Sequence, residues 1–146
     1  MKRILVGYDG SDGGGRAIDR AIAETRDSHG RITVLSVANL PLDLDVPRNF
    51  GTLDDISPHE GDRLSPPPDV VAHLTEARDR LAAAGLEAEL IWAAGEPAHA
   101  IVDTARRIRA DVIVLGEHHH GFLGSLFGAD VDGEVKREAG CGVILA

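Results

Sequence analysis

The sequence has one cysteine, few basic residues and no long apolar run, and each shortage excludes a class of protein. Cys141 stands alone and can form no disulfide within the chain, which is typical of proteins in a reducing compartment. Lys and Arg number 15 against 24 Asp and Glu, giving a formal net charge of -9. Because the basic residues are also scattered instead of forming a stripe, we expect no nucleic-acid partner.

The apolar segments are too short for a signal peptide or a membrane span. Near the N-terminus the apolar stretch covers only Ile4 to Val6, far less than the core of a signal peptide. No other run approaches the roughly 20 residues that cross a bilayer. We therefore expect a cytoplasmic protein without a membrane partner.

What remains is the composition of an ordinary globular domain. Hydrophobic residues make up 43% of the 146 residues and charged residues 27%, which is enough apolar material for one sizeable core. We predict a single domain over residues 1–146. Within it, residues 39–68 are rich in proline, aspartate and glycine, which indicates a long loop, either a lid over a site or a partly disordered segment.

Outside that loop, short apolar runs alternate with segments of helical periodicity. The runs predict strands at residues 4–6, 32–38, 86–92, 111–115 and 143–145, and the periodic segments predict helices at about 17–25, 70–81, 98–108 and 130–139. The third strand alternates in polarity, which predicts one wetter face near a sheet edge. This order of elements predicts an α/β fold, a three-layer sandwich in which helices cover both faces of a five-stranded parallel sheet with the strand order 3-2-1-4-5.

A ligand site is expected at one edge of this sheet. In such folds ligands bind beyond the carboxyl ends of the strands, where the winding direction reverses. With the first and fourth strands as neighbours, the loop that follows Asp9 faces the loop that follows Gly116. The sequence therefore predicts a crevice between these two loops.

Three stretches carry a family resemblance: ILVGYDGSD near the N-terminus, GEPAHAIVDTARRIRADVIVLG from Gly95, and the final CGVIL. They are similar to the corresponding stretches of the universal stress proteins, and the likeness spans the chain apart from roughly residues 39–68. The resemblance implies the adenine nucleotide alpha hydrolase-like fold and a non-enzymatic stress-response protein that senses an adenine nucleotide, ATP or AMP. It also implies that Asp9 contacts the adenine and that Val37 packs against it.

The phosphate-binding loop of the family departs from its pattern in this chain. The motif uses glycines because their backbone N–H groups can approach phosphate oxygens, and a hydroxyl adds a further donor. Gly116 and Gly128 match its first and last glycines, but the interval between them is one residue short. His119 replaces the middle glycine and Ala129 replaces the hydroxyl residue.

Negative charge follows this loop. Val131 replaces a second small hydroxyl residue, and Asp130 and Asp132 lie where a triphosphate would be held. Because like charges repel, we predict weakened triphosphate binding, although both acids also suit an ordinary helix N-terminus. The nucleotide-binding set that the resemblance implies is Gly7, Asp9, Val37, Leu115, Gly116, His119, Gly128, Ala129, Asp130 and Val131.

Two runs of like residues leave alternatives open. The side chains of His118 to His120 suit a solvent-exposed loop, contact with an anion through partly protonated imidazoles, or a metal site completed by neighbouring carboxylates. Gly13 to Gly15 suit either a close approach to an anion or a loose start of the first helix. Asp9 also suits a plain turn or helix cap.

Two other functions compete with the nucleotide sensor. One is a hydrolase that uses ATP or a metal ion; no nucleophile–base pair, P-loop or zinc-binding helix motif supports it, so any ATP hydrolysis is expected to be slow and incidental. The other is an interaction module with an empty crevice. Universal stress proteins commonly dimerise by pairing their last strands, and residues 143–146 are short and apolar enough to form such a homodimer.

Overall fold

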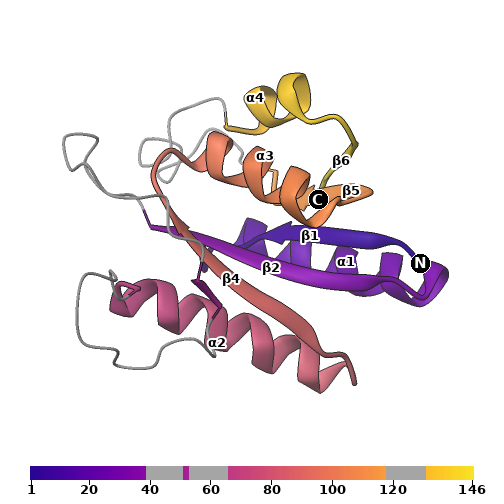
Figure 1. The fold of residues 1–146 in the computed structure, drawn as a ribbon. Coiled ribbons are helices and arrows are strands. Elements are labelled where there is room, and N and C mark those ends of the chain that lie inside the picture. The colour runs from indigo at the N-terminus through magenta and orange to yellow at the C-terminus, as the bar shows by residue number, and fades with distance from the viewer. Residues whose placement is uncertain (39–50, 53–65, 118–130) are drawn as a thin grey trace.

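The computed structural model describes residues 1–38, 51–52, 66–117 and 131–146, and its centre is a sheet (Figure 1). Five strands run parallel in the spatial order β4-β2-β1-β5-β6, which confirms the predicted order 3-2-1-4-5. A short sixth strand, β3, pairs antiparallel with β4 at one edge. The strands are β1 Arg3–Gly7, β2 Arg31–Ala38, β3 Gly51–Thr52, β4 Ala88–Ala94, β5 Val112–Leu115 and β6 Gly142–Leu145.

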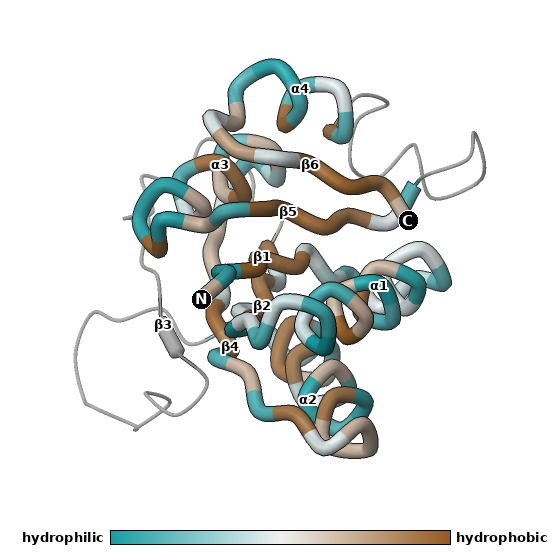
Figure 2. The backbone as a smooth tube through the Cα atoms, turned by 90° about the vertical axis from the view of Figure 1, so that its right-hand side faces the viewer, coloured by the Kyte–Doolittle hydropathy of each residue, from teal (hydrophilic) through white to brown (hydrophobic). Residues whose placement is uncertain are grey.

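Four helices cover the two faces of the sheet and confirm the three-layer arrangement. They are α1 Asp12–Ser28, α2 Pro68–Ala83, α3 Pro97–Ile108 and α4 Val131–Glu138. Helices α1 and α2 pack on one face, and α3 and α4 on the other (Figures 1 and 2). The sheet therefore contributes apolar side chains to two separate cores.

The unbroken apolar runs arise because both faces of each central strand are buried. In β1, the side chains of Ile4 and Val6 belong to the core under α1 and α2, whereas Leu5 belongs to the core under α3 and α4. All three side chains are fully buried. Figure 2 shows the strands as apolar segments between more polar helices. A strand that is buried on both faces is stabilised by apolar residues at every position.

The helix ends follow the signals in the sequence. Ser11 caps α1, since its Oγ accepts a hydrogen bond from the N–H of Gly14 at 3.1 Å. Pro97 is the first residue of α3, where its missing N–H costs no helical hydrogen bond. Helix α2 stops before Gly85, whose φ of +76° is in the left-handed region that glycine adopts without strain.

The stretch 39–68 contains structure that the sequence did not predict. Strand β3 lies within it and pairs through Thr52 with Ile91 of β4, and α2 already begins at Pro68. A strand of two residues is too short to show any periodicity, which is why the prediction missed it. Residues 39–50 and 53–65 lie outside the described residues, so the order of that loop stays a prediction.

The prediction for the third parallel strand was partly wrong. The strand was expected at 86–92 with one wetter face, but β4 runs from Ala88 to Ala94, and Leu90 to Ala93 are all buried. Only the beginning of β4 is exposed to solvent, at Glu89. Since β2 and β3 flank the strand and helices cover both faces, its second half has no open side. Trp92 accordingly packs in the core, 4% exposed.

Candidate functional site

The carboxyl ends of β1 and β5 meet at one edge of the sheet, as the sequence predicted for the crevice. The two strands are neighbours, with Val6 opposite Val114, so the residues that follow each strand leave the sheet together. The first turn of α1 lies against the β5 loop: a Cβ built on Gly13 would be 3.5 Å from the Cα of Gly116. Asp9 and Gly116 therefore belong to one site.

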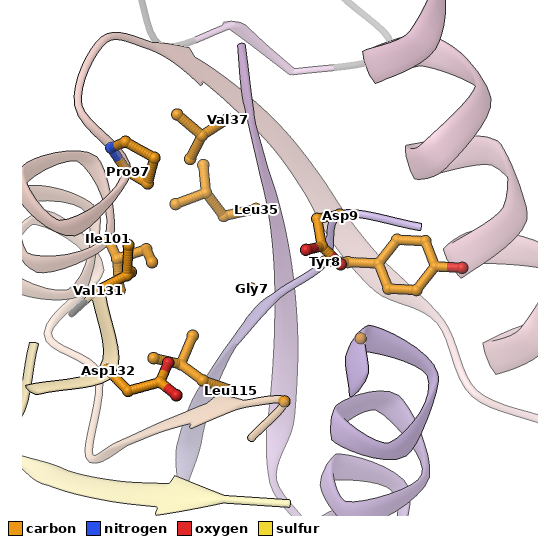
Figure 3. A pocket seen from close by; sticks show the side chains of 12 residues that line it. Gly7, Tyr8, Asp9, Leu35, Val37, Pro97, Ile101, Leu115, Val131 and Asp132 are labelled. Carbon is orange, nitrogen blue, oxygen red and sulfur yellow. The ribbon is translucent and has the colours of Figure 1, made fainter. Parts of the chain in front are cut away.

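A pocket opens at this edge, on the face covered by α3 and α4 (Figure 3). Its wall is mostly apolar and comes from two strands and two helices: Leu35, Val37, Pro97, Ile101, Leu115 and Val131. Gly7, Tyr8, Gly14 and Gly116 also line it. An apolar wall of this kind with a few polar groups beside it is typical of small-molecule sites.

Gly7 keeps the floor of the pocket open. A Cβ at this position would lie 2.8 Å from the Cδ2 atom of Leu115 and 3.9 Å from the Cδ1 atom of Ile101. Any larger residue would thus have to displace the Leu115 side chain or occupy the pocket itself. The absence of a side chain at Gly7 is what leaves room for a ligand here.

Two carboxylates, those of Asp9 and Asp132, also line the pocket. Figure 3 shows Asp9 opposite the apolar wall, and Asp132 beside Leu115 at the end of the pocket away from Val37 and Pro97. Among the described lining residues none is Lys, Arg or His. The charged side chains among the described lining residues are therefore both acidic.

The Asp9 carboxylate is oriented by Ser11. The N–H of Ser11 donates to Oδ1 of Asp9 at 3.0 Å, and the Ser11 hydroxyl donates to the same oxygen. The same hydroxyl oxygen accepts from the N–H of Gly14, so the turn and the start of α1 form one hydrogen-bonded unit. Such an Asx turn holds the carboxylate in place at the N-terminus of α1.

Tyr8 fixes the same turn from its other side. Its side chain is 3% exposed, and its hydroxyl donates to Oε1 of Glu76 on α2 at 2.5 Å. Burial, followed by the hydrogen bond and the negative charge of Glu76, raises the pKa of Tyr8 to about 12. The ring of His73 meets the Tyr8 ring edge-on, with centroids 6.3 Å apart. The phenol is therefore a neutral donor that anchors the β1 turn to α2.

The glycine run at the start of α1 has a packing role that neither sequence interpretation foresaw. A Cβ on Gly14 would lie 2.9 Å from the Tyr8 ring and 3.0 Å from Oδ1 of Asp9, and one on Gly15 would lie 2.9 Å from the Arg80 guanidinium. Both glycines let α1 approach these groups closely. In the described structure the run thus serves close packing, and the helix begins with a firm cap.

The loop after β5, on the other side of the site from Asp9, forms hydrogen bonds with Ala146. The N–H of Glu117 donates to the carbonyl oxygen of Ala146 at 2.8 Å, and the N–H of Ala146 donates to that of Leu115 at 2.8 Å. Arg16 of α1 donates through its guanidinium to the carbonyl oxygen of Glu117 at 3.1 Å. These hydrogen bonds hold the backbone on either side of Gly116, which lines the pocket.

Six of the ten predicted site residues line this one pocket: Gly7, Asp9, Val37, Leu115, Gly116 and Val131. The other four, His119, Gly128, Ala129 and Asp130, lie outside the described residues, as do His118 and His120. Their roles stay predictions.

Sequence reasoning missed four lining residues, Tyr8, Leu35, Pro97 and Ile101. Leu35 lies two positions before Val37 on the same strand face, a spacing that could have identified it. Ile101 lies one helical turn after Pro97, and both had a sufficient explanation in helix packing. An apolar pocket wall has the same pattern as an apolar core.

The described residues contain neither a cluster of metal ligands nor a helix that could span a membrane. Within residues 1–38, 51–52, 66–117 and 131–146, no group of three or more His, Cys, Asp or Glu side chains could hold a metal ion. The described helices include none that combines the length and apolar character needed to cross a membrane.

This sequence is similar to proteins of one family. The model of the universal stress protein family matches residues 1–146. The universal stress protein YxiE of Bacillus subtilis (strain 168) is 30% identical over 153 residues, covering 99% of this chain and 98% of the relative. A Thermus aquaticus universal stress protein, named for its place in the QAH/OAS sulfhydrylase 3′ region, is 33% identical over 150 residues, with 99% and 98% covered.

Solved structures share the fold. A universal stress protein in complex with cAMP superposes with a TM-score of 0.70 at 26% identity, covering 99% of this chain and 95% of its own. The Archaeoglobus fulgidus universal stress protein in complex with dAMP gives a TM-score of 0.66 at 25% identity, with 99% and 97% covered. The shared architecture is the adenine nucleotide alpha hydrolase-like fold.

Proposed function

This chain belongs to the universal stress protein family, and from that premise we propose that it is a stress-response protein that binds an adenine nucleotide in the pocket between Asp9 and Gly116. Two relatives of the same fold were solved with cAMP and dAMP, both adenine nucleotides. The observation that carries the proposal is the convergence of Asp9, Val37 and Leu115 on one pocket.

The pocket suits the two faces and the polar edge of an adenine ring. Leu35 and Val37 come from β2, whereas Pro97 and Ile101 come from α3, so apolar atoms are available on both sides of a flat base. Asp9 offers its carboxylate to the polar edge of the base, as the family resemblance implies. Burying a planar ring against such walls is favourable at about 25 cal/mol per Å² of apolar surface.

We propose that AMP binds more tightly than ATP. The loop that would hold the phosphates has His119 for a glycine and Ala129 for a hydroxyl residue, and it is one residue short. Asp132 adds a carboxylate to the pocket lining itself. Each extra phosphate then adds negative charge without the donors that would neutralise it.

Isothermal titration calorimetry with AMP and with ATP tests this proposal. We expect measurable AMP binding, ATP binding at least about tenfold weaker, and a further loss of about tenfold for AMP in Asp9→Asn, which removes the charge from a charge-assisted hydrogen bond. Asn keeps an oxygen that can accept from Ser11, so the turn survives.

The matched control is Asp27→Asn, an exposed aspartate on α1 that does not line the pocket. It should bind AMP like the wild type. Absence of binding for both nucleotides would refute the proposal and favour the interaction module.

We further propose a homodimer formed through the edge of β6, within residues 143–146. Strand β6 lies at the end of the sheet, and Val143, Ile144 and Leu145 are only half-buried there. The N–H groups of Gly142 and Ala146 donate to carbonyl groups at 3.3 and 2.8 Å on the β5 side. Strand alternation turns the N–H groups of Val143 and Leu145 outward, where a second copy could accept them.

Analytical ultracentrifugation of Val143→Pro tests the dimer. Proline removes one outward N–H, so we expect a folded monomer, whereas Val143→Ala retains the N–H and stays dimeric. A monomeric wild type, or a dimeric Val143→Pro, would overturn the interface.

We propose that this protein is cytoplasmic and that it binds its nucleotide without catalysing a reaction. The Asp9 carboxylate accepts two hydrogen bonds from Ser11, which suits a group that binds a ligand. Burial raises the pKa of the lone Cys141 thiol, so this cysteine is a poor nucleophile. Hydrolysis of ATP faster than a slow background rate would contradict this part of the proposal.

A further inference from the structure

A second cavity, the amino-end groove, lies at the opposite end of the sheet, where the strands begin. Figure 2 shows the N-terminus beside β1, β2 and β4 at this end. The groove has a volume of about 610 Å³, which is within the range of ligand sites. Its lining includes Arg3, Arg31, Thr33, Glu87, Glu89 and Ile108.

The polar side chains of the groove share one face of the sheet. Arg3 pairs in register with Arg31 between β1 and β2, and Thr33 pairs with Glu89 between β2 and β4. Leu35, two positions after Thr33, packs in the core under α3 and α4. Because alternate residues of a strand point to the same side, the four polar side chains lie on the α3 face.

The two ends of the groove carry opposite charge. Arg3 and Arg31 form a cationic end on β1 and β2, and Glu87 and Glu89 form an anionic end at the start of β4. All four residues are exposed. Among the residues that the structure describes, Arg31, Glu87 and Glu89 take part in no ion pair. Their charges are therefore available to a ligand.

Thr33 adds a polar group between the two ends. Its side chain is only 8% exposed. The hydroxyl groups of two other buried threonines, Thr25 and Thr104, donate to backbone carbonyl oxygens at 2.8 and 2.7 Å, whereas that of Thr33 has no partner among the described residues. Buried polar groups are normally hydrogen-bonded, so this hydroxyl suits contact with a ligand in the groove.

The distance between the charged ends sets the length of that ligand. Strand β2 separates β1 from β4, and neighbouring strands lie about 4.8 Å apart, so the ends are roughly 10 Å apart. An extended chain spans about 3.3–3.6 Å per residue, so three residues cover the same distance. A free tripeptide carries a carboxylate at one terminus and an ammonium group at the other.

We propose that the amino-end groove binds short free peptides of about three residues. The terminal carboxylate lies at Arg3 and Arg31, whose guanidinium groups suit its two oxygens, and the terminal ammonium group lies at Glu87 and Glu89. The groove shares no lining residue with the pocket beside Asp9, so this binding does not depend on the nucleotide.

A titration of the ¹⁵N-labelled protein with triglycine tests the proposal, at about pH 7 and one low ionic strength. We expect saturable shifts of the Arg31, Thr33 and Glu89 amides, with a Kd in the millimolar range because exposed charge pairs are weak. Acetyl-triglycine lacks the ammonium group, triglycine amide lacks the carboxylate, and glycine is too short to span the groove. Each should bind at least about fivefold more weakly than triglycine.

Two variants assign the ends. Glu89→Gln should weaken triglycine about fivefold and abolish its advantage over acetyl-triglycine, because the ammonium group loses its partner. Arg31→Gln should likewise abolish the advantage over triglycine amide. The control is Arg26→Gln, an exposed arginine of α1 that does not line the groove, and it should behave like the wild type.

Three results would overturn the proposal. The first is the absence of shifts at these amides with triglycine in excess. The second is binding of glycine or acetyl-triglycine as tight as that of triglycine. The third is a preference for triglycine that survives both Glu89→Gln and Arg31→Gln, since the charged ends would then play no part in it.

Discussion

Gly116 packs its backbone directly against the backbone of Gly13. A Cβ built on Gly116 would lie 2.2 Å from both the carbonyl carbon and the carbonyl oxygen of Gly13. No real Cβ tolerates such a distance, and the obstacle is main chain that no side-chain rotation can move. The two loops of the site are thus in contact, backbone to backbone, beside the pocket that Gly116 lines.

This contact predicts that Gly116→Ala is strongly destabilising. The methyl group would force α1 away from β5, which we expect to lower the free energy of unfolding by about 3 kcal/mol. Urea denaturation measures it. Gly140→Ala is the matched control, since a Cβ on Gly140 meets nothing within 4 Å. Equal stability of the two variants would show that the loops do not depend on this contact.

Two neighbouring glycines should respond differently to alanine. In Gly14→Ala the Cβ would lie 2.9 Å from the buried Tyr8 ring and 3.0 Å from Oδ1 of Asp9, so the carboxylate must shift. AMP affinity should fall by about fivefold or more. In Gly13→Ala the nearest backbone atom is 3.5 Å away, an ordinary contact.

Gly13→Ala should therefore keep the wild-type AMP affinity and gain up to about 1 kcal/mol of stability, because alanine favours the helix. Calorimetry and urea denaturation on both variants give the comparison. A loss of affinity in Gly13→Ala as large as in Gly14→Ala would argue against the specific role of the Asp9 contact.

The raised pKa of Tyr8 predicts a loss of stability at high pH. Below pH 10 the phenol is protonated in both the folded and the unfolded chain, so its contribution is fully present. Between pH 10 and about 12 the unfolded chain ionises first and binds fewer protons, so stability falls as pH rises. Because the hydrogen bond to Glu76 is only part-buried, solvent reduces the loss to about 1 kcal/mol.

Denaturant titration of the wild type and Tyr8→Phe over this pH range isolates the effect. Phenylalanine keeps the ring but loses the hydroxyl, so the variant should be less stable at neutral pH by about 1–2 kcal/mol. The difference between the two proteins should then shrink as pH rises from 10 to about 12. A constant difference would contradict the raised pKa.

The fold could be predicted from the sequence because burial on both faces leaves a plain pattern. Runs such as Ile4 to Val6 are apolar at every position, and their alternation with helical segments determines the layers. Strand β3 could not be predicted, since Gly51 and Thr52 owe their pairing to β4 and have no periodicity of their own. The start of β4 was placed too early because alternating polarity continues into the turn before it.

The site was only partly predictable, for a related reason. Asp9 and Val37 were identified through the family resemblance, and Gly116 through its place after a strand. Pro97 and Ile101 were not, because an apolar side chain that lines a pocket obeys the same periodicity as one in a core. The roles of Gly14 and Gly116 in close packing depend on contacts between elements far apart in the sequence.

The most direct test of the central claim is a titration of the ¹⁵N-labelled protein with AMP, followed by amide chemical shifts. If the adenine nucleotide occupies the pocket, the amides of Gly7, Asp9 and Gly116 should shift progressively, while those of Gly30 and Thr33 at the opposite end of the sheet stay in place. Shifts centred on Gly30 and Thr33, or no shifts with AMP in excess, would contradict the account.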